Sequence, residues 1–172
     1  IIPNMLSDGQ RMAAYRFEGY WKDVGTLDSL WDANMDLLDP TDPLNMREST
    51  FKIYSRNYAN PSTLITPSSK ISNSLMAEGC VIRGTVENSV LYTGCVVEEG
   101  AIVRGTVLMP NTVVKSGAVV EYAIIGEGCT IEGNVHIGQD RAEWPVEDWG
   151  IAVVGHHKTI PSGTVIVPKA IV

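Results

Sequence analysis

From Leu64 onward, small and aliphatic residues recur in one repeated step. One small residue is followed by two aliphatic ones at 74–76, 89–91, 106–108 and 123–125, with spacings of 15, 17 and 17 residues. The segment EGCVIRG at 78–84 also returns 49 residues later as EGCTIEG. A helix would show a 3.6-residue period, whereas β-branched pairs spaced five to seven residues apart, with Gly, Asn or Ser between them, are typical of hexapeptide β-helices. The pattern predicts a left-handed parallel β-helix whose coils stack and bury the aliphatic side chains.

The predicted β-helix domain covers residues 64–172. Its regular part runs from about Leu64 to Ile137, and charge, proline and two tryptophans (Trp144 and Trp149) interrupt it at 138–150 before aliphatic repeats return. We expect these tryptophans to anchor the excursion by packing within the chain. The residues expected to point inward are Ile71, Ile82, Val97, Val103, Val114 and Ile131.

The chain before the repeats has a different pattern. Residues 15–24 begin with strand-like alternation, and Thr26 is a good N-cap for a following helix. The segment 39–63 is rich in Pro, Asp, Asn and Ser, which predicts a linker with a short strand at 51–54. The apolar face of the helix is formed by Leu27, Leu30, Trp31, Met35 and Leu38.

Charge and cysteine content narrow the function classes. The 172 residues carry a formal net charge of −7. Such a chain lacks the basic face needed for general nucleic-acid or anionic-membrane binding, so we expect neither partner. No apolar run approaches the roughly 20 residues that span a bilayer. Cys80, Cys95 and Cys129 cannot all pair, so a reducing cytoplasm is the expected location, with the cysteines as core or corner residues.

Two segments resemble a known enzyme family. EGYWKDVGT at 18–26, followed by LW-x-ANMDLL at 30–38, closely resembles bacterial glucose-1-phosphate adenylyltransferases. The stretches VENSVL at 86–91 and VLMPN at 107–111 are similar to the β-helix of that family. The resemblance implies that residues 1–38 end a nucleotidyltransferase domain, that 39–63 is a linker and that 64–172 is the β-helix. The opening IIPNM has no initiator methionine, so we expect a piece of a longer protein.

The resemblance also implies chemistry. The family makes ADP-glucose and pyrophosphate from ATP and glucose 1-phosphate for glycogen synthesis, with Mg²⁺ held by carboxylates. The resemblance assigns the role of one of those carboxylates to Asp23. Taken alone, Asp23 is an ordinary turn residue. A Gly-rich nucleotide loop is absent from this sequence, so we expect the chain itself to be inactive and to serve oligomerisation and regulation.

The resemblance also implies a second site, which would bind a regulatory effector. Members of the family are often regulated by sugar phosphates and nucleotides that bind near basic residues around the tail of the β-helix. The resemblance places His156, His157 and Lys158 there, although several relatives carry arginine where this chain has histidine. Homo-oligomers, commonly tetramers, are also implied, and surface exposed from Trp21, Leu30, Trp31 and Met35 is expected to favour self-association.

Two other functions fit parts of the sequence. A hexapeptide acyltransferase would share the β-helix and use a histidine base, for which His136, His156 and His157 are candidates, but it leaves residues 1–63 unexplained. A non-catalytic regulatory paralogue would have no need to keep the metal carboxylate. The intact segment from Asp23 to Thr26 disfavours it.

Overall fold

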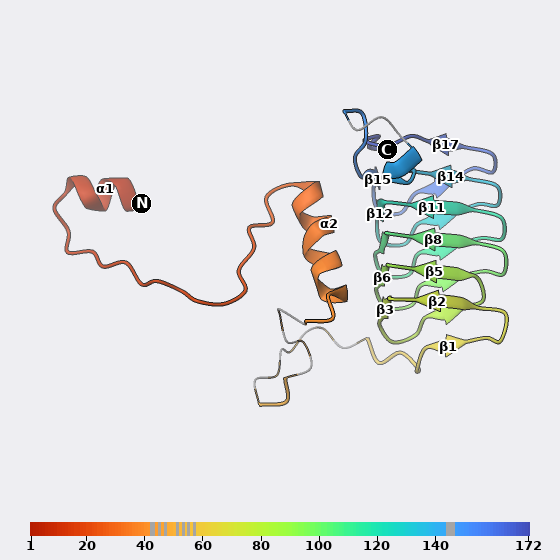
Figure 1. Ribbon diagram of the computed structural model, residues 1–172, viewed down its shortest axis with the longest axis horizontal. Coiled ribbons are helices and arrows are strands. Elements are labelled where there is room, and N and C mark those ends of the chain that lie inside the picture. The colour runs from red at the N-terminus through yellow and green to blue at the C-terminus, as the bar shows by residue number, and fades with distance from the viewer. Residues whose placement is uncertain are drawn as a thin grey trace.

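The computed structural model describes the chain except residues 42, 43, 45, 47, 51, 53, 55, 57 and 144–146. From Leu64 onward the chain forms a parallel β-helix with three sheets, here called A, B and C (Figure 1). Sheet A comprises β1 (Leu64–Ile65), β4 (Val81–Ile82), β7 (Val96–Val97), β10 (Val113–Val114), β13 (Thr130–Ile131) and β16 (Thr159–Ile160). The first strand of the β-helix begins at Leu64.

The other two sheets repeat the same order along the axis. Sheet B comprises β2 (Lys70–Ser72), β5 (Thr85–Glu87), β8 (Ile102–Arg104), β11 (Val119–Glu121), β14 (His136–Ile137) and β17 (Val165–Ile166). Sheet C comprises β3 (Leu75–Met76), β6 (Val90–Leu91), β9 (Val107–Leu108), β12 (Ala123–Ile125) and β15 (Ala152–Val154). All of these pairs are parallel, and the small-aliphatic-aliphatic steps stack in register as sheet C.

The core is a stack of aliphatic side chains inside the prism. Ile82, Val97, Val103, Val114 and Ile131 are each 0% exposed, as predicted. Ile71 pairs with Val86 on the same inward row but is 37% exposed. Its strand β2 lies at the end of sheet B, so no further strand of the described residues covers it.

The N-terminal part contains α1 (Ile2–Ser7), α2 (Leu27–Met35) and a 3₁₀ turn, η1 (Asp36–Leu38), and a second such turn, η2 (Arg141–Glu143), lies in the excursion. Of the N-terminal part, α2 lies beside the β-helix, whereas α1 lies apart from it (Figure 1). The strand-like prediction for residues 15–24 is wrong, because this segment pairs with no strand of the described chain. The predicted strand at 51–54 cannot be compared, since Phe51 and Ile53 lie outside the described residues. No helix in the described part is long and apolar enough to cross a membrane.

Helix α2 begins where the sequence predicts. The Thr26 hydroxyl accepts a hydrogen bond from the Ser29 backbone N–H at 3.2 Å, and the Ser29 hydroxyl oxygen accepts one from the Thr26 N–H at 3.0 Å, which forms a reciprocal capping box. After η1, Asp39 and Pro40 end the helical segment.

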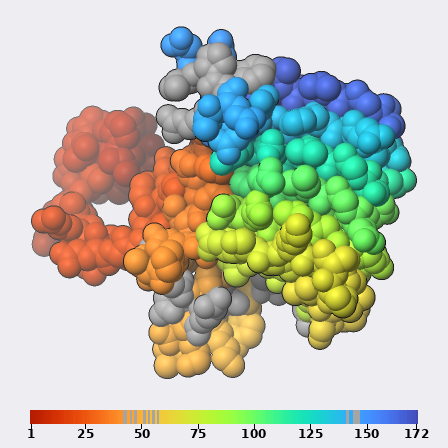
Figure 2. Space-filling model, turned by 45° about the vertical axis from the view of Figure 1, so that its right-hand side comes forward, coloured from red at the N-terminus to blue at the C-terminus, as the bar shows by residue number. Residues whose placement is uncertain are grey.

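The apolar face of α2 covers the outer face of sheet C. In Figure 2 the orange atoms around α2 lie directly against the green atoms of the β-helix. Leu30, Trp31 and Met35 pack against an outward cluster on that sheet. The prediction that these three residues expose apolar surface is therefore wrong, and of the four residues named for it only Trp21, at 74% exposed, lies open. The outward cluster consists of Val107, Ile124, Ile151 and Val153.

Candidate functional site

Asp23 lies in the extended segment immediately before the helix cap. Its side chain is exposed and has no hydrogen bond or ion pair with a described residue. Within the described part of the chain, no group of three or more His, Cys, Asp or Glu side chains is placed to hold a metal ion. Asp23 thus presents a single carboxylate, and any further ligands would have to come from elsewhere.

The residues around Asp23 are tied to the end of α2. Asp36 accepts hydrogen bonds from the Lys22 ammonium at 2.7 Å and from the Tyr20 hydroxyl at 2.8 Å. These contacts, that of Lys22 above all, lower the pKa of Asp36 below its ordinary value. Lys22 is half-buried in this clamp, and it holds the segment that carries Asp23 against η1.

Helix α2 is in turn anchored on the β-helix. The indole Nε1 of Trp31 donates to the backbone carbonyl of Gly105 at 2.7 Å, and the Tyr92 hydroxyl donates to Oδ1 of Asn34 at 3.1 Å. The Trp31 ring also lies 6.2 Å from the ring of Tyr122, centroid to centroid. Because Trp31 and Asn34 fix α2 on the coils, the position of the Asp23 segment that is clamped to this helix depends on the β-helix.

Tyr122 lies at the corner between sheets B and C, and its side chain contacts both α2 and the excursion at 138–150. It has φ of 45°, in the left-handed region that a bulky residue rarely adopts. Its ring contacts Trp149 edge-on at 5.5 Å, and its hydroxyl donates to Asp140 at 3.3 Å. The predicted packing of Trp149 within the chain is confirmed, while Trp144 lies outside the described residues.

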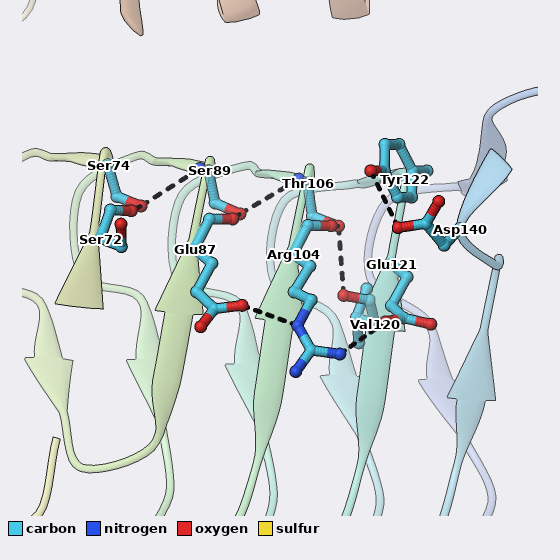
Figure 3. Close-up of polar contacts among 10 residues, drawn as sticks. All are labelled: Ser72, Ser74, Glu87, Ser89, Arg104, Thr106, Val120, Glu121, Tyr122 and Asp140. Atoms are coloured by element: carbon cyan, nitrogen blue, oxygen red, sulfur yellow. Dashed lines mark hydrogen bonds and ion pairs between the residues drawn. The ribbon is translucent and has the colours of Figure 1, made fainter. Parts of the chain in front are cut away.

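A hydroxyl ladder follows the corner between sheets B and C (Figure 3). The Ser89 N–H donates to the Ser74 hydroxyl at 3.2 Å, and the Thr106 N–H donates to the Ser89 hydroxyl at 3.1 Å. The Thr106 hydroxyl lies 3.3 Å from the Val120 carbonyl of the next coil. Ser74, Ser89 and Thr106 stand first in the repeated step because their side chains are small enough for the corner. Each hydroxyl also forms a hydrogen bond with a backbone group of the next coil.

A charged ladder runs beside it on the outer face of sheet B. Arg104 bridges Glu87 at 2.7 Å and Glu121 at 3.0 Å (Figure 3). Nε2 of His136 lies 3.6 Å from Glu121 and has no hydrogen-bond partner among the described residues. Sequence reasoning missed this ladder, although the 17-residue spacings of Glu87, Arg104 and Glu121 place them in one row.

His156, His157 and Lys158 form the corner between sheets C and A in the last coil. All three side chains are exposed, and Nδ1 of His156 accepts a hydrogen bond from the Glu127 N–H at 3.0 Å. His157 has φ of 56° and occupies the corner position that Gly79, Gly94 and Gly128 hold in other coils. The structure brings the three side chains to one corner, and their role in effector binding stays a prediction.

The cysteines occupy equivalent inward positions. Cys80, Cys95 and Cys129 are buried and free, and their thiols point to carbonyl groups of the next coil, those of Tyr92, Met109 and Gly155. The hydrogen bond with Cys80, together with burial, raises the pKa of Cys95. The prediction of core or corner cysteines is confirmed.

Residues 64–154 match the family described as GlmU-like, C-terminal hexapeptide. The chain belongs to this hexapeptide family. The family assignment agrees with the predicted left-handed hexapeptide β-helix. Residues 1–40 separately match the nucleotidyl transferase family, and α2, which packs on the hexapeptide coils, lies within that range.

The chain is also similar to several glucose-1-phosphate adenylyltransferases. It is 54% identical over 112 residues to that of Clostridium perfringens (strain SM101 / Type A), covering 65% of this chain and 29% of the relative. It is 38% identical over 168 residues to that of Acetivibrio thermocellus, covering 95% and 39%. The enzyme of Bacillus mycoides (strain KBAB4) is 45% identical over 148 residues, covering 86% and 39%. The chain thus spans well under half the length of these relatives.

Proposed function

We propose that this chain is the C-terminal portion of a glucose-1-phosphate adenylyltransferase, with an oligomerising and regulatory role in making ADP-glucose from ATP and glucose 1-phosphate. The observation that carries the proposal is the docking of α2. Residues of the nucleotidyl transferase match (1–40) pack directly on hexapeptide coils, as expected if one protein contains both. The reaction belongs to cytoplasmic glycogen synthesis.

Asp23 is the residue of this chain that would bind Mg²⁺. An exposed carboxylate with no partner in the described part of the chain fits a hard cation that prefers oxygen ligands. Bound there, the ion would neutralise charge on the phosphates. Tyr20, Lys22 and Asp36 hold the backbone around Asp23 in place through the clamp at the end of α2.

Regulation is proposed to act through the same docked helix. His156, His157 and Lys158 provide imidazole and ammonium groups at one exposed corner, which suits an anionic effector. The rigid β-helix connects that corner with the coils on which α2 rests. An effector that shifted the catalytic domain against the β-helix would therefore move Asp23.

The test is ADP-glucose formation from ATP and glucose 1-phosphate with excess Mg²⁺. The full-length protein that carries this chain is expected to be active, whereas the 172-residue chain alone is expected to form no product because it has no Gly-rich loop. A full-length protein that uses another nucleotide or sugar in preference would contradict the proposed substrates. Turnover by the chain alone would contradict its proposed role.

A further inference from the structure

A groove lies between the helical segment and the corner of the β-helix where sheet B turns into sheet C. Its volume is about 520 Å³, within the roughly 300–1,000 Å³ of small-molecule sites. Its lining comes from two parts of the chain, the end of α2 with η1 and the residues after it, and the corners of successive coils. The corner residues are Asn73, Asn88, Gly105 and Tyr122, all with positive φ. Because the strands before this corner pair in register, these residues lie in one row along the groove.

The two amides of this row are only partly used within the chain. Nδ2 of Asn73 donates to Oδ1 of Asn88 at 3.0 Å. The amide nitrogen of Asn88 and the amide oxygen of Asn73 have no hydrogen bond with a described residue, and both side chains are exposed. The row therefore offers a ligand one donor group and one acceptor.

Two carboxylates also line the groove. Asp36 accepts from Tyr20 and Lys22 through Oδ2, and its Oδ1 has no partner in the described part of the chain. Asp39 accepts from the N–H and the hydroxyl of Thr41 through Oδ1, and its Oδ2 likewise has none among the described residues. These hydrogen bonds lower the pKa of both carboxyl groups, that from the Lys22 ammonium most for one and that from the Thr41 N–H most for the other. Each carboxylate is thus ionised near neutral pH and keeps one oxygen for a ligand.

Two aromatic rings supply apolar surface beside these polar groups. Trp31 and Tyr122 both line the groove. Their polar atoms are already bound, the indole N–H to the Gly105 carbonyl and the phenol hydroxyl to Asp140. A ligand therefore meets carbon atoms of the two rings, whose electron-rich faces attract polarised C–H groups.

This combination selects among ligand classes. The lining contains no Lys, Arg or His, so two ionised carboxylates would repel a phosphate or another anion. An organic ammonium ion would suit the carboxylates but has no acceptor for the amide hydrogens of Asn88. An aliphatic ligand would remove the amides and carboxylates from water without replacing their hydrogen bonds. A neutral sugar has hydroxyl groups that donate to carboxylates and accept from an amide, and C–H groups that pack on aromatic rings.

We propose that this groove binds a neutral glucose-based sugar, whose hydroxyl groups donate to Asp36 and Asp39 and accept from Asn88. The site lies at the corner between sheets B and C, whereas the basic corner proposed for an anionic effector lies between sheets C and A. The choice of glucose rests on the proposed function. Binding is measured without ADP-glucose formation, so either proposal can fail alone.

The test is a titration of the ¹⁵N-labelled 172-residue chain with maltose or cellobiose, two neutral glucose disaccharides. The indole N–H of Trp31 reports on the groove by NMR, and at least one sugar should shift it saturably, with a Kd in the millimolar range because the groove is open. Maltose 1-phosphate should bind at least about tenfold more weakly than maltose, because the carboxylates repel its phosphate. Spermidine, a cation, should bind more weakly than the sugar.

Two variants remove the groups that bind the sugar. Asn88→Gly keeps the positive φ of 46° without strain and removes the amide, so sugar binding should weaken about threefold to tenfold. Asp39→Asn keeps an acceptor for Thr41 but removes the charge and should weaken binding by at least about threefold. Matched controls are Asn111→Gly, with φ of 58° at a corner between sheets C and A, and Asp32→Asn on α2. Both are exposed and off the groove and should bind like the wild type.

Circular dichroism checks that each variant is folded. The proposal would be overturned if neither sugar shifts the Trp31 signal saturably, or if maltose 1-phosphate or spermidine binds as tightly as the sugar. It would also be overturned if Asn88→Gly or Asp39→Asn binds like the wild type, or if the controls lose as much affinity as these variants.

Discussion

Nε1 of Trp31 lies 2.7 Å from the carbonyl oxygen of Gly105. Trp31 belongs to the segment that matches the nucleotidyl transferase family, and Gly105 belongs to a corner of the hexapeptide β-helix. Since Lys22 clamps the Asp23 segment to Asp36, directly after the C-terminal end of α2, this bond lies on the route by which the β-helix positions Asp23.

Truncation of Trp31 should undock the helix. Trp31→Ala removes a half-buried ring and its hydrogen bond, so it should lower the free energy of unfolding by about 2–4 kcal/mol. Trp31→Phe keeps most of the packing and should cost about 1 kcal/mol for the lost bond. Urea unfolding measures both. The matched control is Trp21→Ala, whose ring is exposed, and a loss there as large as in Trp31→Ala would contradict the docking role.

A charge inside the prism should disrupt the coils, whereas one outside should not. Ile131→Asp buries an unpaired carboxylate in β13 and should cost at least about 3 kcal/mol. Thr130→Asp, on the outward side of the same strand, should cost less than about 1 kcal/mol. Thermal unfolding followed by circular dichroism compares them. Equal losses would mean that the inward and outward rows are assigned wrongly.

The coils were predictable from sequence because each one buries the same local positions. The inward row from Ile82 to Ile131 follows from spacing alone. Ile71 differs because its strand β2 is the end strand of sheet B in the described part of the chain. The ladder of Glu87, Arg104 and Glu121 could also have been predicted from the sequence, since equal spacings in a solenoid place residues side by side.

The contacts around Asp23 were not predictable in the same way. The clamp joins Lys22 to Asp36 across 14 residues, and Trp31 meets Gly105 across 74, at separations that no local period generates. The alternation at 15–24 failed as a strand because alternation reports two faces but supplies no hydrogen-bonding partner. Of the predicted apolar face, Leu30, Trp31 and Met35 pack on sheet C, whereas Leu27 is 41% exposed. The sequence pattern of the helix does not show which surface it packs against.

Glycine in place of His157 should stabilise the folded chain. A non-glycine residue with φ of 56° is strained, so His157→Gly should raise the free energy of unfolding by about 0.5–1 kcal/mol. His156→Gly is the matched control and should lower it, because the Glu127 N–H loses its acceptor. Chemical denaturation measures both values. A destabilising His157→Gly would mean that its side chain contributes more than the strain costs.

The clamp should weaken in acid. Because the pKa of Asp36 is lowered in the folded chain, the stabilisation is complete above the ordinary value of 3.8 and is lost as pH falls through the folded value. The pair is partly exposed, so this contributes less than about 1 kcal/mol. Lys22→Met should raise the pKa of Asp36, as measured by carboxyl-carbon NMR titration. An unchanged titration would show that Lys22 does not hold Asp36.

The most direct measurement of the central claim is the turnover number of the full-length protein with Asp23→Asn. Asparagine keeps the shape but removes the negative charge proposed to hold Mg²⁺, so kcat for ADP-glucose formation should fall by orders of magnitude with unchanged circular dichroism. Asp28→Asn, at another exposed aspartate in the first turn of α2, should keep near-normal turnover. Near-normal turnover in Asp23→Asn would remove Asp23 from the metal site and contradict the account.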